Sequence, residues 1–174
     1  MDKSKEIKTE RLLLKLISDS DKEDMLCLLK DPKIKATYMI PDLETKEQED
    51  KIFNRLKEVS SSKDHFAYGV YLNGKVIGYL NDVEKNEEEI EVGYFISSKE
   101  WNKGYATEIL SAAIKELFIL GYKKVNAGHF ACNPASGRVM QKCGMKRILK
   151  AETITYRGVD HDVIYYQIVN QKEE

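Results

Sequence analysis

The stretch that decides the fold reads EVGYFISSKEWNKGYATE and runs from Glu91 to Glu108. Its first part has the pattern of a strand that ends near Ile96, and Gly104 then opens a helix. Amides in the first turn of a helix have no partner inside the helix, and the helix dipole is positive there. A glycine at that point lets a ligand approach the backbone closely. The stretch therefore predicts a diphosphate-binding loop, with Lys103 as a cation beside it.

A helix start without any ligand would also explain Gly104. Two common phosphate-binding patterns, GxxxxGK[ST] and GxGxxG, are absent from the chain. The loop therefore has to be interpreted together with the elements around it.

The periodicity of the remaining chain predicts an α/β (α+β) fold, with a central mixed, largely antiparallel sheet of about seven strands flanked by about four helices. Asn73-Gly74 predicts a tight hairpin, and the charged tails are expected to fray. The strands are expected at 9–17, 65–72, 75–80, 89–96, 123–131, 148–156 and 163–169, and the helices at 19–31, 45–59, 104–121 and 133–144.

Composition limits the classes of function. A length of 174 residues suits one domain over 1–174, and a net charge of −1 gives no general attraction to nucleic acid or an anionic membrane. No apolar run approaches the roughly 20 residues of a membrane span. Three cysteines and three histidines show no metal-ligand spacing. We therefore expect a cytoplasmic protein with reduced thiols and no metal.

Three segments carry a resemblance to a known family. Residues 101–108 (WNKGYATE) resemble the coenzyme A loop of the GNAT superfamily of N-acetyltransferases. Residues 133–136 (NPAS), followed by 138–145 (RVMQKCGM), are similar to the NxxS…KxGF segment of the branch that acetylates the N-terminal alanine or serine of ribosomal proteins. Residues 9–12 (TERL) resemble the opening of that branch, and the likeness covers roughly 8–169.

This resemblance implies a single GNAT-like domain and acetyl-CoA as co-substrate. It implies a sheet splayed between strand 91–96 and strand 125–131, with the pantetheine arm in the splay and a bulge near Gly93. Trp101 stands where the family usually has Gln or Arg. The residues expected to bind the coenzyme are Tyr94, Phe95, Ile96, Lys103, Gly104, Tyr105, Ala106, Thr107, Asn133 and Ser136.

The chemistry of acyl transfer to an amine requires a base, because only a neutral amine attacks a thioester. Related enzymes often place a carboxylate at the position of Glu91, which makes it the candidate base; a solvated glutamate at a strand edge is the alternative. His129 is a second candidate, with a structural histidine as its alternative. For the leaving thiolate, Met140 stands where many relatives have a tyrosine. Ser136 is the candidate donor instead, or else an ordinary residue in the first turn of a helix.

The resemblance implies an N-acetyltransferase that moves an acetyl group onto a primary amine by direct attack in a ternary complex. The acceptor is a protein N-terminus or a small molecule such as a polyamine, an amino acid or an antibiotic. A polyamine would favour an acidic pocket, for which Asp42, Glu44 and Glu47 are available. A non-catalytic acyl-CoA-binding module and a structural protein without a cofactor are the other options. The oligomeric state stays open, with a homodimer among the options.

Overall fold

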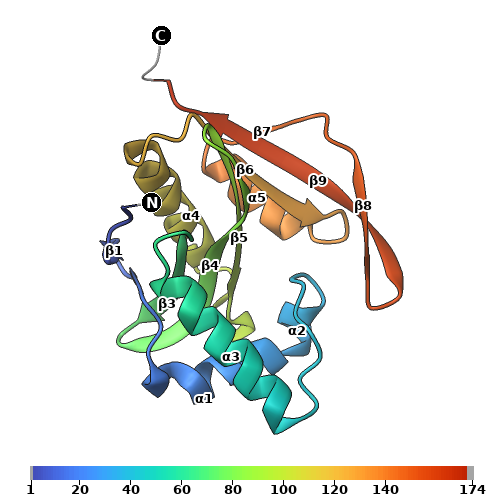
Figure 1. Cartoon of the computed structure of the whole chain (residues 1–174). Helices are drawn as coiled ribbons and strands as arrows, with labels where there is room; N and C mark the ends of the chain where they lie inside the picture. The colour runs from blue at the N-terminus through green and yellow to red at the C-terminus, as the bar shows by residue number, and fades with distance from the viewer. Residues whose placement is uncertain (1, 172–174) are drawn as a thin grey trace. The chain divides into compact units, whose positions relative to one another are not determined.

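A computed structural model describes residues 2–171, whose elements Figure 1 shows in chain order. Nine strands form one mixed, mostly antiparallel sheet in the order β1-β2-β3-β4-β5-β6-β9-β7, with β8 paired to β9. Helices accompany the strands, so the predicted α/β class is confirmed. The described residues divide into two compact units: unit 1 contains those up to Asn81 and Tyr94–Ile109, and unit 2 contains Asp82–Gly93 and those from Leu110 onward. One domain over 1–174 stays a prediction.

The sheet of unit 1 is antiparallel. β1 (Glu6–Lys8) pairs with β2 (Leu13–Lys15), β2 pairs with β3 (Ala67–Leu72), and β3 pairs with β4 (Lys75–Lys85). The hairpin at Asn73-Gly74 is confirmed, and both residues have the positive φ angles, 50° and 82°, that a tight hairpin turn needs. The expectation that the N-terminal tail frays was wrong for β1, which is fixed by pairing of Ile7 opposite Leu14.

The helical elements of unit 1 that precede β3 are η1 (Asp19–Asp21), α1 (Lys22–Lys30), α2 (Pro32–Lys35) and α3 (Lys46–Ser61). The sequence predicted that Asp31-Pro32 ends a helix, and α1 does end there. The same pair also begins α2, because Asp31 accepts a hydrogen bond from the amide of Lys33 at 2.9 Å and proline suits the first helical position. The helices pack on a core that includes Phe53, Tyr71 and Phe95.

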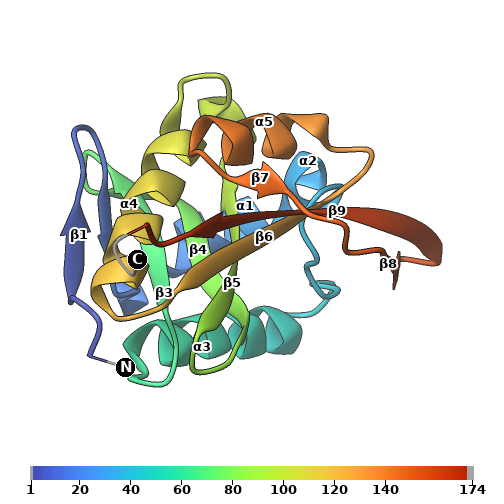
Figure 2. The same cartoon turned by 90° about the horizontal axis from the view of Figure 1, so that it is seen from above.

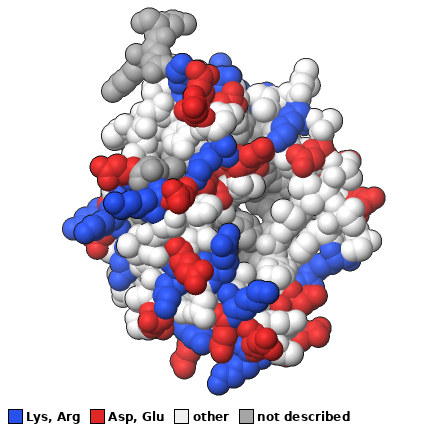
Figure 3. Space-filling model, viewed as in Figure 1, with Lys and Arg blue, Asp and Glu red and all other residues white. Residues whose placement is uncertain are grey.

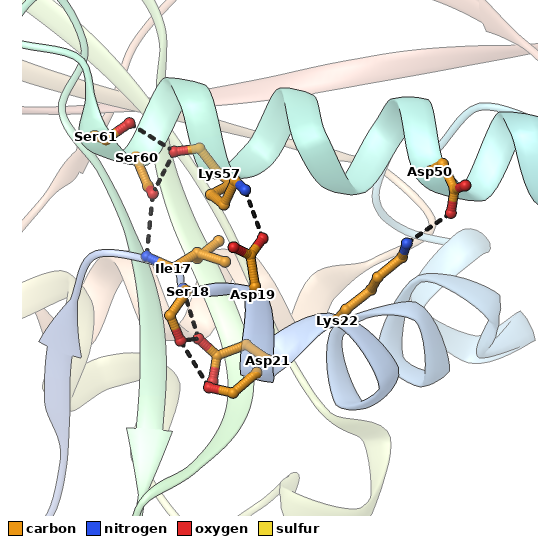
Figure 4. A network of polar contacts seen from close by, with 10 residues as sticks. Ile17, Ser18, Asp19, Asp21, Lys22, Asp50, Lys57, Ser60 and Ser61 are labelled. Carbon is orange, nitrogen blue, oxygen red and sulfur yellow. Dashed lines mark hydrogen bonds and ion pairs between the residues drawn. The ribbon is translucent and has the colours of Figure 1, made fainter.

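A polar network joins the start of the helical region to the end of α3 (Figure 4). The hydroxyl of Ser60, a buried residue, accepts a hydrogen bond from the amide of Ile17 at 3.1 Å and donates to the carbonyl of Lys57 at 2.9 Å. The ammonium of Lys57 lies 2.5 Å from a carboxylate oxygen of Asp19, which is 84% exposed. The buried hydroxyl therefore satisfies the backbone, while the exposed ion pair contributes little.

In unit 2, β6 (Lys124–Phe130) is the central strand. It pairs with β9 (Val159–Val169) along its whole length and, in parallel, with the first residues of β5 (Glu89–Ile96). The parallel ladder contains three pairs, from Glu89 opposite Lys124 to Glu91 opposite Asn126. The predicted splay requires β5 and β6 to diverge. If they diverge after Glu91, their ladder contains only these three pairs. Figure 2 shows α5 (Pro134–Lys142) beside β6 and β9.

The remaining elements explain why the structure has nine strands rather than about seven. The strand predicted at 148–156 contracts to β8 (Glu152–Tyr156), and β7 (Lys146–Arg147) lies just before the predicted range as an additional short strand; both pair with β9. The predicted strand at 9–17 contracts to Leu13–Lys15, and β1 is additional. The long helix α4 (Tyr105–Ile119) begins in unit 1 and continues in unit 2.

The surface carries charges of both signs. On the face drawn in Figure 3, Lys and Arg side chains are interspersed with Asp and Glu side chains among the described residues. Positive and negative side chains are therefore mixed on this face rather than separated into two poles. Each helix within residues 2–171 is too short or too polar to span a lipid bilayer.

Candidate active site

The predicted anion loop, residues 101–107, lies in unit 1 between η2 (Ser98–Glu100) and the body of α4. Asn102 and Gly104 have φ angles of 62° and 83°, in the left-handed region that glycine adopts without strain. The amide of Glu108 bonds the carbonyl of Gly104 at 3.0 Å. The amides of Tyr105 and Ala106 lie ahead of this bond, in the first turn, where a helix attracts an anion.

Arg11 and Glu108 form an ionic cluster beside this loop. The carboxylate oxygen Oε2 of Glu108 lies 2.8 Å from Nε and 2.7 Å from Nη2 of Arg11, while Oε1 accepts from the Arg11 amide at 2.8 Å and from the Thr9 hydroxyl at 2.5 Å. Nη1 of Arg11 donates to the carbonyl of Lys103 at 2.9 Å. Burial alone would raise the pKa of Glu108, but the hydrogen bonds from Thr9 and Arg11 outweigh it and hold the pKa below its usual range. Glu108 is therefore a charged, structural carboxylate.

Lys103 was predicted to be the cation of the loop. Its side chain is half exposed, and its ammonium lies 2.7 Å from a carboxylate oxygen of Glu100. Sequence reasoning missed Arg11 as the cation that contacts the loop. In the sequence, the segment TERL shows only a likeness to the family. No linear pattern shows that Arg11 and Lys103, which are 92 positions apart, are in contact.

The strand that leads into the loop changes phase. Ile90 and Val92 are buried in alternation, whereas Phe95 and Ile96 are buried next to each other. A β-bulge adds one residue to a strand and thereby shifts the alternation of buried and exposed side chains by one position. The predicted bulge near Gly93 would have this effect. Of the three residues expected to bind pantetheine through the backbone, Ile96 has its carbonyl engaged by the indole nitrogen of Trp101, at 2.8 Å.

Gly78 of β4 lies close to the same strand. A Cβ added at Gly78 would lie 2.3 Å from the carbonyl oxygen of Phe95, a distance that real Cβ atoms do not show. Phe95 also packs edge-on against Tyr38, with the ring centroids 4.9 Å apart. Tyr94 is half-buried. The position of Phe95 is therefore fixed by contact with β4 and with an aromatic ring of the same unit.

Glu91 lies in unit 2, among residues that the sequence did not point to. Its side chain is only 15% exposed, and a carboxylate oxygen is 3.6 Å from the ammonium of Lys150. The same ammonium is 3.6 Å from Glu152 and 3.8 Å from the centroid of the Tyr165 ring. The Tyr165 hydroxyl in turn donates to Glu152 at 2.5 Å. Lys150 is thus shared between two carboxylates and an aromatic face.

Burial raises the pKa of the Glu91 carboxyl above its usual range, and the charges of Glu152 and Glu84 act in the same direction. Lys150 lowers the pKa of Glu91, but by less than burial raises it. A raised pKa makes a carboxylate a stronger base, which is the property that a general base requires. The alternative of a solvated strand-edge glutamate is wrong for Glu91, although its neighbour Glu88 is a surface residue paired with Lys123 at 2.7 Å.

His129 can be assigned to the interior. It is 7% exposed, and its Nδ1 lies 2.8 Å from the carbonyl of Phe130, which makes Nδ1 the protonated nitrogen and Nε2 an acceptor. Nε2 is buried without a hydrogen-bond partner in the described residues, and a Cβ on Gly137 would lie 2.6 Å from it. The ring also stacks on Tyr166. The ring is therefore held among interior groups, and a role of His129 as a base stays a prediction.

The predicted residues at the start of α5 also lie in unit 2. Asn133 occupies the N-cap position, but its side chain makes no capping hydrogen bond; its carbonyl accepts from the amide of Ser136 at 3.2 Å. Ser136 is half-buried in the first turn, and Met140 is buried in the core. Within residues 2–171, no group of three or more His, Cys, Asp or Glu residues is arranged to hold a metal ion.

Comparison with known proteins gives one family. The family model described as "Acetyltransferase (GNAT) domain" matches residues 11–146. The "Uncharacterized N-acetyltransferase YoaA" of Bacillus subtilis (strain 168) is 25% identical over 173 residues, 96% of this chain and 98% of that protein. A crystal structure of an acetyltransferase (GNAT family) from Bacillus anthracis is 27% identical, with a TM-score of 0.80 over 94% of this chain and 98% of that one.

More distant structures share the fold. A putative ribosomal-protein-serine acetyltransferase from Vibrio cholerae has a TM-score of 0.74 at 20% identity and covers 98% of this chain and 100% of its own. A spermidine N-acetyltransferase from Vibrio cholerae, in complex with CoA and spermine, has a TM-score of 0.77 at 19% identity over 93% of this chain and 97% of its own. Acceptors therefore differ among proteins of this fold.

Proposed function

We propose that the acceptor of this chain is the α-amine at a protein or peptide N-terminus. The premise is that the chain belongs to the GNAT family of acetyltransferases and is therefore an acetyl-CoA-dependent acyltransferase. The observation that carries the proposal is Glu91, a buried carboxyl whose pKa is raised. An α-ammonium has a pKa of roughly 7.7–8.0, against about 10.4 for a lysine-type amine. Transfer of its proton to a carboxylate is therefore much less uphill.

In the proposed reaction, the first amides of α4 and the loop residues Lys103–Thr107 bind the diphosphate of acetyl-CoA. Backbone groups of Tyr94–Ile96 and the side chain of Asn133 bind its pantetheine arm. Glu91 accepts a proton from the α-ammonium, directly or through water, and the neutral amine attacks the thioester carbon. The C–S bond breaks as the C–N bond forms, and the nitrogen gives up its second proton to the departing thiolate, directly or through water, which leaves the amide and the free CoA thiol. The Ser136 hydroxyl donates a hydrogen bond to the departing sulfur. Transfer is direct, within a ternary complex.

A polyamine is the second candidate acceptor. It is favoured by Glu91 and Glu152, which share one lysine, and by Glu84, whose charge acts on Glu91, because several carboxylates attract a polycation. The sequence had pointed to Asp42, Glu44 and Glu47 for this purpose. Those three side chains are exposed on a connection and the start of α3, so they give no such support.

The test measures release of CoA thiol with a panel of amines. The panel contains a peptide with a free α-amine and no lysine, the same peptide with its N-terminus blocked and one lysine added, and spermidine. Turnover of the first peptide alone is expected. Turnover of spermidine alone would identify the polyamine reaction. Absence of turnover with every amine, although acetyl-CoA binds, would favour the non-catalytic acyl-CoA-binding module.

A further inference from the structure

Arg11 contacts the anion loop from a segment far away in the sequence. Its guanidinium donates to the carbonyl of Lys103 and to the carboxylate of Glu108, so that it bridges the residue before Gly104 and the first turn of α4. Its Cζ also lies 4.5 Å from the centroid of the Tyr105 ring. One side chain thus touches three points of the loop and helix start.

We propose that Arg11 is a positioning residue for coenzyme binding: it holds the anion loop in the conformation that presents the first amides of α4 to the diphosphate. The inference rests on the role of the loop in the proposed function. Arg11 itself need not contact the coenzyme, since its donors to Lys103 and Glu108 are already engaged.

The geometry requires an arginine rather than any cation. A guanidinium is a planar fork whose nitrogens can bond a carboxylate and a carbonyl at once while its face stacks on a ring, whereas a lysine ammonium is a point charge. The space is also limited, because a Cβ added at Gly104 would lie 3.3 Å from Nη2 of Arg11. Glycine at 104 and arginine at 11 therefore fit each other.

Charge acts in the same direction as geometry. Glu108 is in the first turn of α4, close to the amides that attract an anion. An unpaired carboxylate there would repel a diphosphate, and the hydrogen bond and ion pair from the Arg11 side chain offset its charge. Removing the guanidinium would therefore loosen the loop and expose a negative charge beside it.

The surrounding contacts make the proposal testable without unfolding the protein. The Thr9 hydroxyl and the Arg11 amide bond Glu108 independently of the guanidinium. A variant that changes only the side chain of Arg11 therefore keeps this segment attached to α4. Arg55, an exposed residue of α3, offers a matched control.

The experiment compares Arg11→Met, Arg11→Lys and the control Arg55→Met with the unchanged protein. Titration calorimetry with CoA gives Kd, and thiol release gives kcat and KM with acetyl-CoA and with S-acetylpantetheine, which lacks the diphosphate. For Arg11→Met we expect a rise of about tenfold in Kd and in KM for acetyl-CoA, and kcat within about twofold. Its kcat/KM for S-acetylpantetheine should equal that of the unchanged protein. Arg11→Lys should recover only part of the affinity, and Arg55→Met should change nothing.

Three results would overturn the proposal: unchanged CoA affinity in Arg11→Met, full recovery in Arg11→Lys, or an equal loss with both thioesters, which would indicate a general structural role. The CoA titration needs no acceptor, so its result can be interpreted even if the proposed acceptor is wrong. Failure of the unchanged protein to bind CoA would refute the proposed role of the loop itself, whereas binding that is insensitive to Arg11 would refute only the inference about Arg11.

Discussion

Glu108 in unit 1 and Glu91 in unit 2 are partly buried glutamates that each lie beside a single basic side chain. The pKa values of their carboxyls nevertheless shift in opposite directions. Glu108 accepts a hydrogen bond at 2.8 Å from the Arg11 guanidinium and forms an ion pair with it at 2.7 Å, and it accepts two more hydrogen bonds from Thr9 and the backbone. Glu91 lies 3.6 Å from an ammonium that it shares with Glu152. The pKa of Glu108 is lowered and that of Glu91 is raised.

Burial and pairing together decide whether a carboxyl stays charged or exchanges a proton. Both carboxyls are desolvated, which disfavours the charged form. Four short donors outweigh this cost at Glu108, which therefore stays charged and fixes structure. One distant, divided donor does not outweigh it at Glu91, which is therefore able to take up and release a proton.

The largest effect is expected from Glu91→Gln. A base that takes part in proton transfer contributes about 10²- to 10⁴-fold to the rate, so kcat should fall by that range while KM for acetyl-CoA stays the same. Steady-state thiol release measures both. Glu88→Gln is the matched control, because Glu88 is an exposed neighbour paired with Lys123. A full-rate Glu91→Gln variant would remove Glu91 from the mechanism and end the functional half of the comparison.

Glu108→Gln should affect stability rather than the catalytic rate. The pKa of Glu108 is lower in the folded protein than in the unfolded chain, where it is roughly 4.3. The contribution of Glu108 to the stability of the fold is therefore fully present at a pH above the unfolded pKa and is lost as the pH falls through the folded pKa. The variant should lose roughly 1–2 kcal/mol of unfolding free energy at pH 7 and much less at pH 3. Urea unfolding at the two pH values measures this.

The control for that experiment is Asp19→Asn, which removes an exposed pair with Lys57 (Figure 4) and should have little effect at either pH. An equal loss for Glu108→Gln at pH 7 and pH 3 would contradict the assignment of Glu108 as a charged, strongly bonded group.

The sequence could predict those parts of the molecule that have a local cause. Asn73-Gly74 specified its hairpin, and the run from Glu91 to Glu108 predicted a strand, a loop and a helix because alternation, glycine and helical periodicity are properties of neighbouring residues. The family resemblance supplied the position of Glu91 but could not say whether its side chain was solvated. That required the tertiary structure, which buries it.

The parts that could not be predicted depend on contacts between distant residues. Lys150 lies in the connection between β7 and β8, where the sequence predicted an unbroken strand, and no local pattern brings it to Glu91. Arg11 reaches the loop across 92 positions. The sequence also cannot show that the ring of His129 lies against Gly137 and Tyr166. Side-chain environment, rather than residue type, separated these roles.

Lys150→Met should change the pH dependence of catalysis. Lys150 lowers the pKa of Glu91, so its removal should raise that pKa further. A base acts in its ionised form, so the ascending limb of the kcat–pH profile should move to higher pH, with the plateau rate retained. Lys123→Met, which removes the exposed pair with Glu88, is the control and should leave the limb in place. A limb that moves to lower pH would contradict the assignment of Lys150.

The smallest effect, and one of opposite sign, is expected from Glu152→Gln. The charge of Glu152 raises the pKa of Glu91, and Glu152 also shares Lys150 with it. Loss of that charge lowers the pKa of Glu91 on both counts, so the ascending limb should move to lower pH. The amide oxygen of glutamine can still accept the hydrogen bond from Tyr165, which preserves the packing. Glu84→Gln should act in the same direction but less, since Glu84 is the weaker contributor. If the two glutamine variants move the limb to higher pH, another group is the base, because loss of either charge can only lower the pKa of Glu91.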